Sequence, residues 1–72
     1  MEQFVLETAH ITLGQLLKRL DIIQTGGQAK WFLQEREVLV NGETESRRGR
    51  KLVAGDVVTV DGWGTVSVVA PS

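Results

Sequence analysis

The stretch "TGGQAKWFLQEREVLVNG", residues 25–42, changes its hydrophobic period halfway along. Its first half opens with the Thr-x-x-Gln pattern of a capping box, at Thr25 and Gln28, and continues with apolar residues at helical spacing. After Glu37 the period is two, the residues are β-branched, and an Asn-Gly pair supplies a turn. The stretch therefore predicts a helix followed directly by a strand and a tight turn.

The preceding segment, "ITLGQLLKRLDII", residues 11–23, predicts another short helix. Thr12 and Gln15 repeat the Thr-x-x-Gln pattern, and Ile11 stands where a hydrophobic residue can staple onto the first turn. Lys18 falls on the exposed side of this predicted helix. The apolar face follows the i, i+3, i+4, i+7 spacing and consists of Leu13, Leu16, Leu17 and Leu20.

The remaining segments predict strands. A β-like run, "FVLE", comes near the start, and "VVTV" and "TVSVV" come near the end, bounded by Gly-Asp and Asp-Gly turn signals. Because Asp and Gly tolerate the backbone angles of tight turns, the last two runs predict a hairpin. With 72 residues and no internal repeat, we expect one α+β domain over residues 1–72, in which two short helices pack on a small, mostly antiparallel sheet.

The composition excludes several classes of protein. The chain has no cysteine, which excludes disulfides, cysteine-bound zinc and thiol catalysis. No apolar run reaches transmembrane length, and the first residues, "MEQFVLETAH", lack the features of a secretion signal. We therefore expect a cytoplasmic protein with no membrane partner. Because the formal net charge is −1, only a local basic patch could attract a polyanion.

Half of the eight basic residues fall within five consecutive positions of "SRRGRKL", residues 46–52. One interpretation is a solvated loop in which they pair with nearby glutamates, such as Glu43 and Glu45, or with Glu35 or Glu37. Exposed pairs contribute only about 0–1 kcal/mol each, so stability gives little reason for the cluster. Arginine suits phosphate oxygens, which favours a nucleic-acid contact, although charge alone does not separate RNA from DNA or from an acidic protein. The four residues are Arg47, Arg48, Arg50 and Lys51.

Gly26 and Gly27 fall in the first turn of the second predicted helix. Unsatisfied N–H groups point outward there, and the absence of side chains lets a phosphate approach. The alternative is a flexible loop that merely ends in a helix. Lys30, one turn later, favours an anion site.

No arrangement of residues predicts catalysis or a bound metal. His10 has no second histidine or cysteine to share a metal with, and Asp56 and Asp61 each stand beside a glycine, where aspartate serves a turn. The serines have no convincing base. Trp31 falls beside the apolar stripe of its helix, so we expect it to pack against the core rather than to stack on a base. We expect neither an enzyme, nor a cofactor, nor a small-molecule substrate.

The order of these elements resembles the small RNA-binding domain named after ribosomal small-subunit protein S4. The resemblance covers residues 11–60, and its most specific parts are "VLVNG", which matches Val-x-Val-Asn-Gly, and "GDVV", which matches Gly-Asp-x-Ile/Val. The block "AKWFLQEREVLVNGETESRRGRKL" is similar to small stand-alone bacterial proteins of this class, of the YaaA and YbcJ type. The resemblance implies an L-shaped, two-helix RNA-binding face (the alpha-L motif) beside a short curved sheet.

The chain departs from the pattern of this family at two places. Many members carry basic residues at the starts of both helices, whereas this chain has Thr12, Gln15 and Gly26. The glycine that usually separates the second helix from the strand is replaced by Arg36, which must adopt a left-handed conformation or end the helix in another way.

The sequence thus predicts a monomeric, stand-alone RNA-binding protein with a translation- or ribosome-related role, which grips structured ribosomal or transfer RNA by phosphates and shape. The alternative is an adaptor whose basic loop docks on an acidic protein. DNA binding lacks a convincing recognition helix. The predicted RNA-binding residues are Arg47, Arg48, Arg50, Lys51, Lys30, Gly26, Gly27, Gln28 and Lys18.

Overall fold

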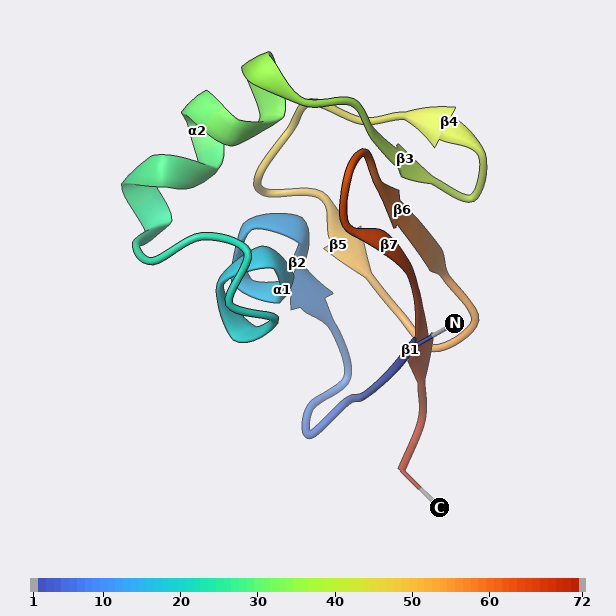
Figure 1. Cartoon of the computed structure of the whole chain (residues 1–72). Helices are drawn as coiled ribbons and strands as arrows, with labels where there is room; N and C mark the ends of the chain where they lie inside the picture. Colours follow the sequence, from blue (N-terminus) through green and yellow to red (C-terminus); the bar gives the residue numbers. More distant parts are fainter. Residues whose placement is uncertain (1, 72) are drawn as a thin grey trace.

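The computed structural model describes residues 2–71 and places two helices beside two small β-sheets (Figure 1). Helix α1 spans Leu13–Arg19 and helix α2 spans Gly26–Glu35. This arrangement confirms the α+β class predicted from the sequence. The strands are β1 Glu2–Val5, β2 Ile11–Thr12, β3 Val38–Val40, β4 Glu43–Thr44, β5 Lys51–Leu52, β6 Val57–Val60 and β7 Gly64–Val69.

The larger sheet has the strand order β1-β7-β6-β3-β4. Its β1–β7 pair is parallel, and the β7–β6, β6–β3 and β3–β4 pairs are antiparallel, so the prediction of a mostly antiparallel sheet is confirmed. The smaller sheet pairs β2 with β5 and sets Ile11 opposite Leu52. The sequence did not predict β2, β4 or β5, because a strand of two residues is too short to show a period.

Two predicted turns connect the strands of the larger sheet. Asn41 and Gly42 have φ angles of 53° and 85° and join Val40 to Glu43, which are partners in the β3–β4 ladder. Positive φ at both central residues is the geometry that fits the twist of a two-residue hairpin. The β6–β7 hairpin turns at residues 61–63, as the Asp-Gly signal predicted.

The core lies between the helices and one face of the larger sheet. Alternate residues of β3, β6 and β7 are buried, which is the period-two pattern of a sheet with one packed face. Helices α1 and α2 contribute the opposite side of the core, with Leu16 and Ala29 fully buried. The buried sheet residues are Val38, Val40, Val58, Val60, Val66 and Val68.

Both helices begin with the caps that the sequence predicted. In α1 the Thr12 hydroxyl accepts from the N–H of Gln15 at 3.3 Å, and the Gln15 side chain accepts from the N–H of Thr12 at 3.0 Å. In α2, Oε1 of Gln28 accepts from the N–H groups of Thr25 at 3.0 Å and Gln24 at 2.6 Å. These bonds satisfy backbone donors close to each helix start and fix where the two helices begin. Neither described helix is long and apolar enough to cross a lipid bilayer.

Candidate nucleic-acid interface

The basic loop, residues 46–51, is organised around the carboxylate of Glu45. This side chain is only 8 % exposed, and the loop folds over it. Its Oε2 accepts from the backbone N–H and from Nε of Arg47, both at 3.0 Å. Its Oε1 accepts from Nη2 of Arg47 at 3.1 Å and from Nη1 of Arg50 at 2.9 Å. Four charge-assisted bonds to one carboxylate hold the loop in a single shape.

The same bonds change the acidity of Glu45. The hydrogen bonds from the side chain and backbone of Arg47, and then the bond from Arg50, lower the pKa of Glu45 to about 2. The side-chain hydrogen bond to Glu45, and then the charge of that carboxylate, raise the pKa of Arg47. Glu45 therefore stays ionised throughout the neutral range.

This geometry divides the four loop cations into two pairs. Arg47 and Arg50 form salt bridges with Glu45, so the pairing with glutamates that the sequence left open holds for these two residues. Arg48 and Lys51 are exposed, and neither forms a salt bridge within residues 2–71. Arg48 and Lys51 therefore keep their charges available to a ligand.

The backbone of the basic loop is bonded to the start of α1. The N–H of Leu13 donates to the carbonyl of Arg50, and the N–H of Gly14 donates to the carbonyl of Arg48, both at 2.8 Å. A Cβ added at Gly14 would lie 3.3 Å from both Cβ and O of Arg48, so glycine permits this close approach. Nη1 of Arg48 also reaches the carbonyl of Gly26, at 3.5 Å.

The structure thus brings the basic loop and the starts of both helices together. Together they line a shallow depression of about 270 Å³, to which Thr12, Gly14, Gly26 and Arg48 contribute. Gly26 and Gly27 are exposed and helical, no acidic residue occupies the first turn of α2, and Lys30 is exposed one turn later. The basic loop brings positive charge to this helix start, where the N-terminal end of the helix dipole is also positive.

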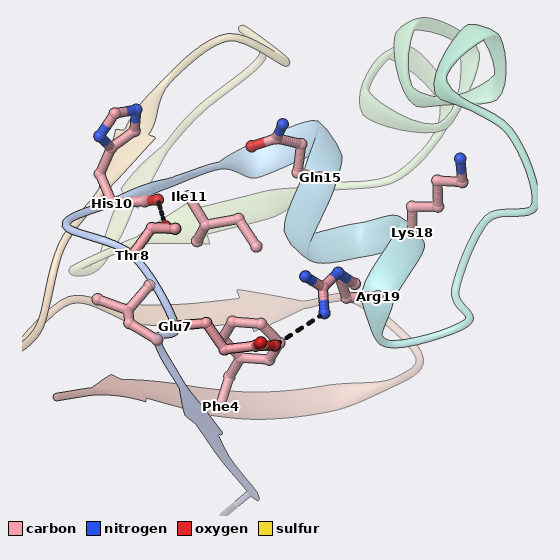
Figure 2. A pocket seen from close by; sticks show the side chains of 9 residues that line it. Phe4, Glu7, Thr8, His10, Ile11, Gln15, Lys18 and Arg19 are labelled. Carbon is pink, nitrogen blue, oxygen red and sulfur yellow. Dashed lines mark hydrogen bonds and ion pairs between the residues drawn. The ribbon is translucent and has the colours of Figure 1, made fainter. Parts of the chain in front are cut away.

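Lys18 lies at a different hollow. This second depression, of about 540 Å³, is walled by α1 and by the segment between β1 and β2, and Lys18 and Arg19 both line it (Figure 2). Arg19 reaches the exposed Glu7 at 3.4 Å. Gln15 lines both this hollow and the depression beside the basic loop. Lys18 is therefore not part of the cluster formed by Arg48 and Gly26.

Comparison with known proteins identifies the family. The S4 domain family matches residues 4–69 of the chain. The chain belongs to this family. The match extends beyond residues 11–60, over which the resemblance was read from the sequence, and takes in the second half of β1 and all of β7.

Individual relatives of this S4 domain are bacterial. A protein of Bacillus subtilis (strain 168) named "Probable ribosome maturation protein RlbA" is 61% identical over 64 residues, which cover 89% of this chain and 90% of that protein. The "Putative RNA-binding protein YbcJ" of Escherichia coli (strain K12) is 41% identical over 61 residues, which cover 85% of this chain and 86% of that protein. The "Uncharacterized protein YbcJ" of Shigella flexneri matches to the same extent, with 41% identity over 61 residues.

Helix α2 of this S4 domain ends at Arg36, in place of the family's usual glycine, without backbone strain. Arg36 has φ −122° and ψ 143°, so helix α2 ends in an extended residue and no left-handed conformation is needed. The N–H of Arg36 donates to the carbonyl of Phe32 at 2.9 Å, and its Nη1 donates to the carbonyl of Asp61 at 3.2 Å. The arginine side chain therefore ties the end of α2 to the β6–β7 turn.

The structure of this S4 domain decides two further predictions, the packing of Trp31 and the turn role of Asp56. The expectation that Trp31 packs against the core is wrong, because the residue is 66% exposed. The buried face of α2 is narrower than the sequence suggested, and Trp31 lies outside it. The turn role of Asp56 is confirmed, because its carboxylate accepts from the N–H of Val53 at 2.9 Å and from the side-chain amide of Asn41 at 3.0 Å.

The described residues do not assemble a metal site. Within residues 2–71, no group of three or more His, Cys, Asp or Glu side chains is placed to hold a metal ion. His10 is exposed at the hollow in Figure 2, where the hydroxyl of Thr8 donates to its backbone carbonyl at 2.7 Å. What this S4 domain does present is a rigid basic loop set against two helix starts.

Proposed function

We propose that this protein binds structured RNA through the basic loop and the start of α2, and that it acts in a ribosome-related process. The observation that carries the proposal is the convergence of Arg48, the N-terminus of α1 and Gly26 on one surface of an S4 domain. Phosphate binding needs exposed cations and free N–H donors held in a fixed relation. Arg48 and Lys51 supply the exposed cations. The donors have to come from the first turn of α2, because the N–H groups of Leu13 and Gly14 in α1 are already bonded to the loop.

Structured RNA suits the surface better than a long single-stranded sequence. The major groove of A-form RNA is too narrow for side chains to read, which leaves phosphates and 2′-hydroxyls as the accessible features. Arg48 and Lys51 are exposed cations of the kind that contact phosphates, and the glycines of α2 leave room for a backbone to approach. The names of two relatives, a probable ribosome maturation protein and a putative RNA-binding protein, support ribosomal RNA as the first RNA to examine.

The proposal describes a binding protein rather than an enzyme. We propose that it acts as a monomer in the cytoplasm, without a cofactor or a small-molecule substrate. Arg47 and Arg50 are bonded to Glu45 and hold the loop in place, whereas Arg48 and Lys51 remain exposed to a ligand.

Fluorescence anisotropy with labelled fragments of ribosomal and transfer RNA tests this function directly. We expect saturable binding at low salt that weakens when Arg48 and Lys51 are both replaced by glutamine. The variant Lys18→Gln removes one charge outside the cluster and shows separately whether this predicted RNA-binding residue contributes. If the purified protein has no measurable affinity for any structured RNA, the function is wrong, and the adaptor with an acidic protein partner takes its place. If binding is found, crosslinking in cells followed by sequencing of the bound RNA would identify that RNA.

A further inference from the structure

The exposed indole of Trp31 stands on the outer side of α2. The helix turns about 100° per residue, so Trp31, two positions after the fully buried Ala29, points away from the core. The residue is 66% exposed, the largest exposed fraction of any large apolar residue among those described. An exposed aromatic ring beside the proposed RNA surface is a candidate for contact with a ligand.

The indole borders a groove of about 340 Å³ between α2 and the segment that joins the two helices. Ile22 and Phe32, both half-buried, line the groove with Trp31. Gln28 also lines it, and because its Oε1 is held by two backbone N–H groups, the NH₂ of that amide is the part left for a ligand. The groove thus combines an aromatic wall, an apolar floor and a positioned donor.

The start of α2 leaves the indole accessible from the side of the RNA interface. Side chains on a helix lean toward its N-terminus, so Trp31 extends over the turn that contains Gly27. A Cβ at Gly27 would meet only the Thr25 hydroxyl, at 3.9 Å, so this position is open. Gly27 therefore puts no side chain between the indole and the start of α2, and the groove and the depression beside Arg48 are separate hollows that both border this helix.

The charges beside the groove favour an anionic ligand. Arg36 and Glu35 both line the groove, and Lys30, which is exposed and directly precedes Trp31, adds a second cation outside the lining. A cation next to a flat aromatic ring matches a nucleotide, whose phosphate is negative and whose base has a face to stack.

The same groove suits a protein partner poorly. A specific protein interface buries about 800 Å² on each side around an apolar centre. The described chain has four exposed large apolar residues, and only Trp31 among them lines the groove. They are Val5 in β1, Trp31 in α2, Val53 after β5 and Trp63 in the β6–β7 turn. A volume near the lower end of small-ligand sites, about 300–1,000 Å³, fits one base.

We propose that the groove beside Trp31 holds one unpaired nucleobase of the bound RNA, stacked on the indole, while the adjacent phosphate lies near Lys30. This inference rests on the proposed function and makes it more specific, because the preferred RNA is then a stem that carries a bulged or terminal unpaired nucleotide. Stacking requires a π-face on both partners, which gives the test its controls.

The test compares three RNA hairpins of equal length: one with a single bulged adenosine, one with an abasic residue at the bulge and one fully paired. Binding is measured for the wild type, Trp31→Leu, Trp31→Phe and the control Trp63→Phe. We expect Trp31→Leu to weaken binding of the bulged hairpin about five-fold or more and to leave the abasic hairpin unchanged. Trp31→Phe should retain most of the affinity, because its ring still stacks. In the Trp63→Phe background, where Trp31 is the one remaining tryptophan, the bulged hairpin should quench indole fluorescence.

The possible results separate this inference from the function on which it rests. If Trp31→Leu binds all three hairpins as tightly as the wild type, the stacking site is wrong and RNA binding by the basic loop stands. Equal weakening on the bulged and abasic hairpins also overturns the inference, because the base then contributes nothing. If the wild type binds none of the hairpins at low salt, the function itself is wrong, and Trp31 becomes a candidate for contact with a protein.

Discussion

Single residues decide how the charge of the basic loop is used, and Glu45 has the largest effect. It is a buried carboxylate, and the two arginines that neutralise it are the residues that would otherwise compete with Arg48 and Lys51 for a phosphate. Because Arg47 and Arg50 are committed to Glu45, the loop has a defined shape before any ligand arrives. Preorganisation of this kind lowers the entropy lost on binding.

Replacing Glu45 by glutamine should destabilise the protein by about 1–3 kcal/mol, because charge-assisted hydrogen bonds to a buried group are lost. The effect should depend on pH. The pKa of Glu45 is lowered from 4.5 to about 2 in the folded protein, so its contribution is full above pH 4.5 and is lost as the pH falls toward 2. Urea unfolding at pH 7 and at lower pH measures both effects.

Glu43→Gln is the matched control for this measurement, since Glu43 is exposed in the neighbouring strand β4. Its replacement should change the free energy of unfolding by less than about 0.5 kcal/mol. Equal losses in the two variants would mean that Glu45 does not organise the loop.

The pairing with Glu45 also predicts which cations carry the salt dependence of RNA binding. If all four loop cations met phosphates, a log-log plot of affinity against salt would have a slope of about −3 to −4. Replacing both Arg48 and Lys51 by glutamine should flatten the slope by about 1.4–1.8, because two phosphate contacts are lost. Replacing Arg47 and Arg50 should flatten it less. Anisotropy titrations over a range of KCl concentrations measure the slopes, and a slope that Arg48 and Lys51 do not affect would move the phosphate site elsewhere.

At the scale of elements, the start of α2 is the part of the interface that glycines form. Gly26 and Gly27 occupy the first helical turn, and a Cβ at Gly26 would meet no atom within 4 Å. Nothing inside the protein therefore requires glycine at this position. The remaining reason for glycine is space for a ligand, or the absence of any selection for helix stability.

Alanine at either glycine should stabilise the protein by up to about 1 kcal/mol, because alanine is the better helix former. The added methyl should weaken RNA binding by obstructing a phosphate at the helix start. Thermal unfolding and anisotropy on the same samples measure the two effects. Gln34→Ala, at an exposed position near the other end of α2, is the control and should leave RNA binding unchanged. Glycine variants that bind RNA normally would mean that the space at Gly26 and Gly27 does not serve a ligand.

At the scale of the whole molecule, the size of the chain limits what it can recognise. The described residues extend over 34 × 22 × 18 Å, and two short helices with one loop offer a footprint of about 600–1,000 Å², by analogy with single DNA-binding modules. Such a footprint suits shape and phosphate recognition of modest affinity. Long sequence-specific contacts would need more surface.

We therefore expect the protein to prefer a folded stem or junction of ribosomal or transfer RNA over a homopolymer of equal length and charge. Competition binding at matched salt measures this preference. Equal affinity for both RNAs would reduce the interface to a nonspecific polyanion patch. Preference for the homopolymer would make stacking on Trp31, and not the basic loop, the main source of affinity.

The sequence alone determined the helices, the longer strands and their turns, because these depend on residues close together in the chain. The caps at Thr12 and Gln28 are made within four residues, and the alternation of Val38 and Val40 follows from the geometry of a strand. The motif around Asn41 and the basic residues likewise sufficed for the resemblance to the S4 domain, which the family comparison confirmed.

Only the tertiary structure decided which residues meet. The bond from Gly14 to Arg48 and the contact of Arg48 with Gly26 join parts of the chain that are far apart in sequence, and no local period predicts them. Trp31 is exposed because the elements packed against α2 cover only a narrow face of that helix. Glu45 looked like one of several surface glutamates, and its burial follows from how the loop closes over it. Local hydrogen bonds and the spacing of apolar side chains specify the helices and strands. Loop closure and packing specify which residues meet on one surface.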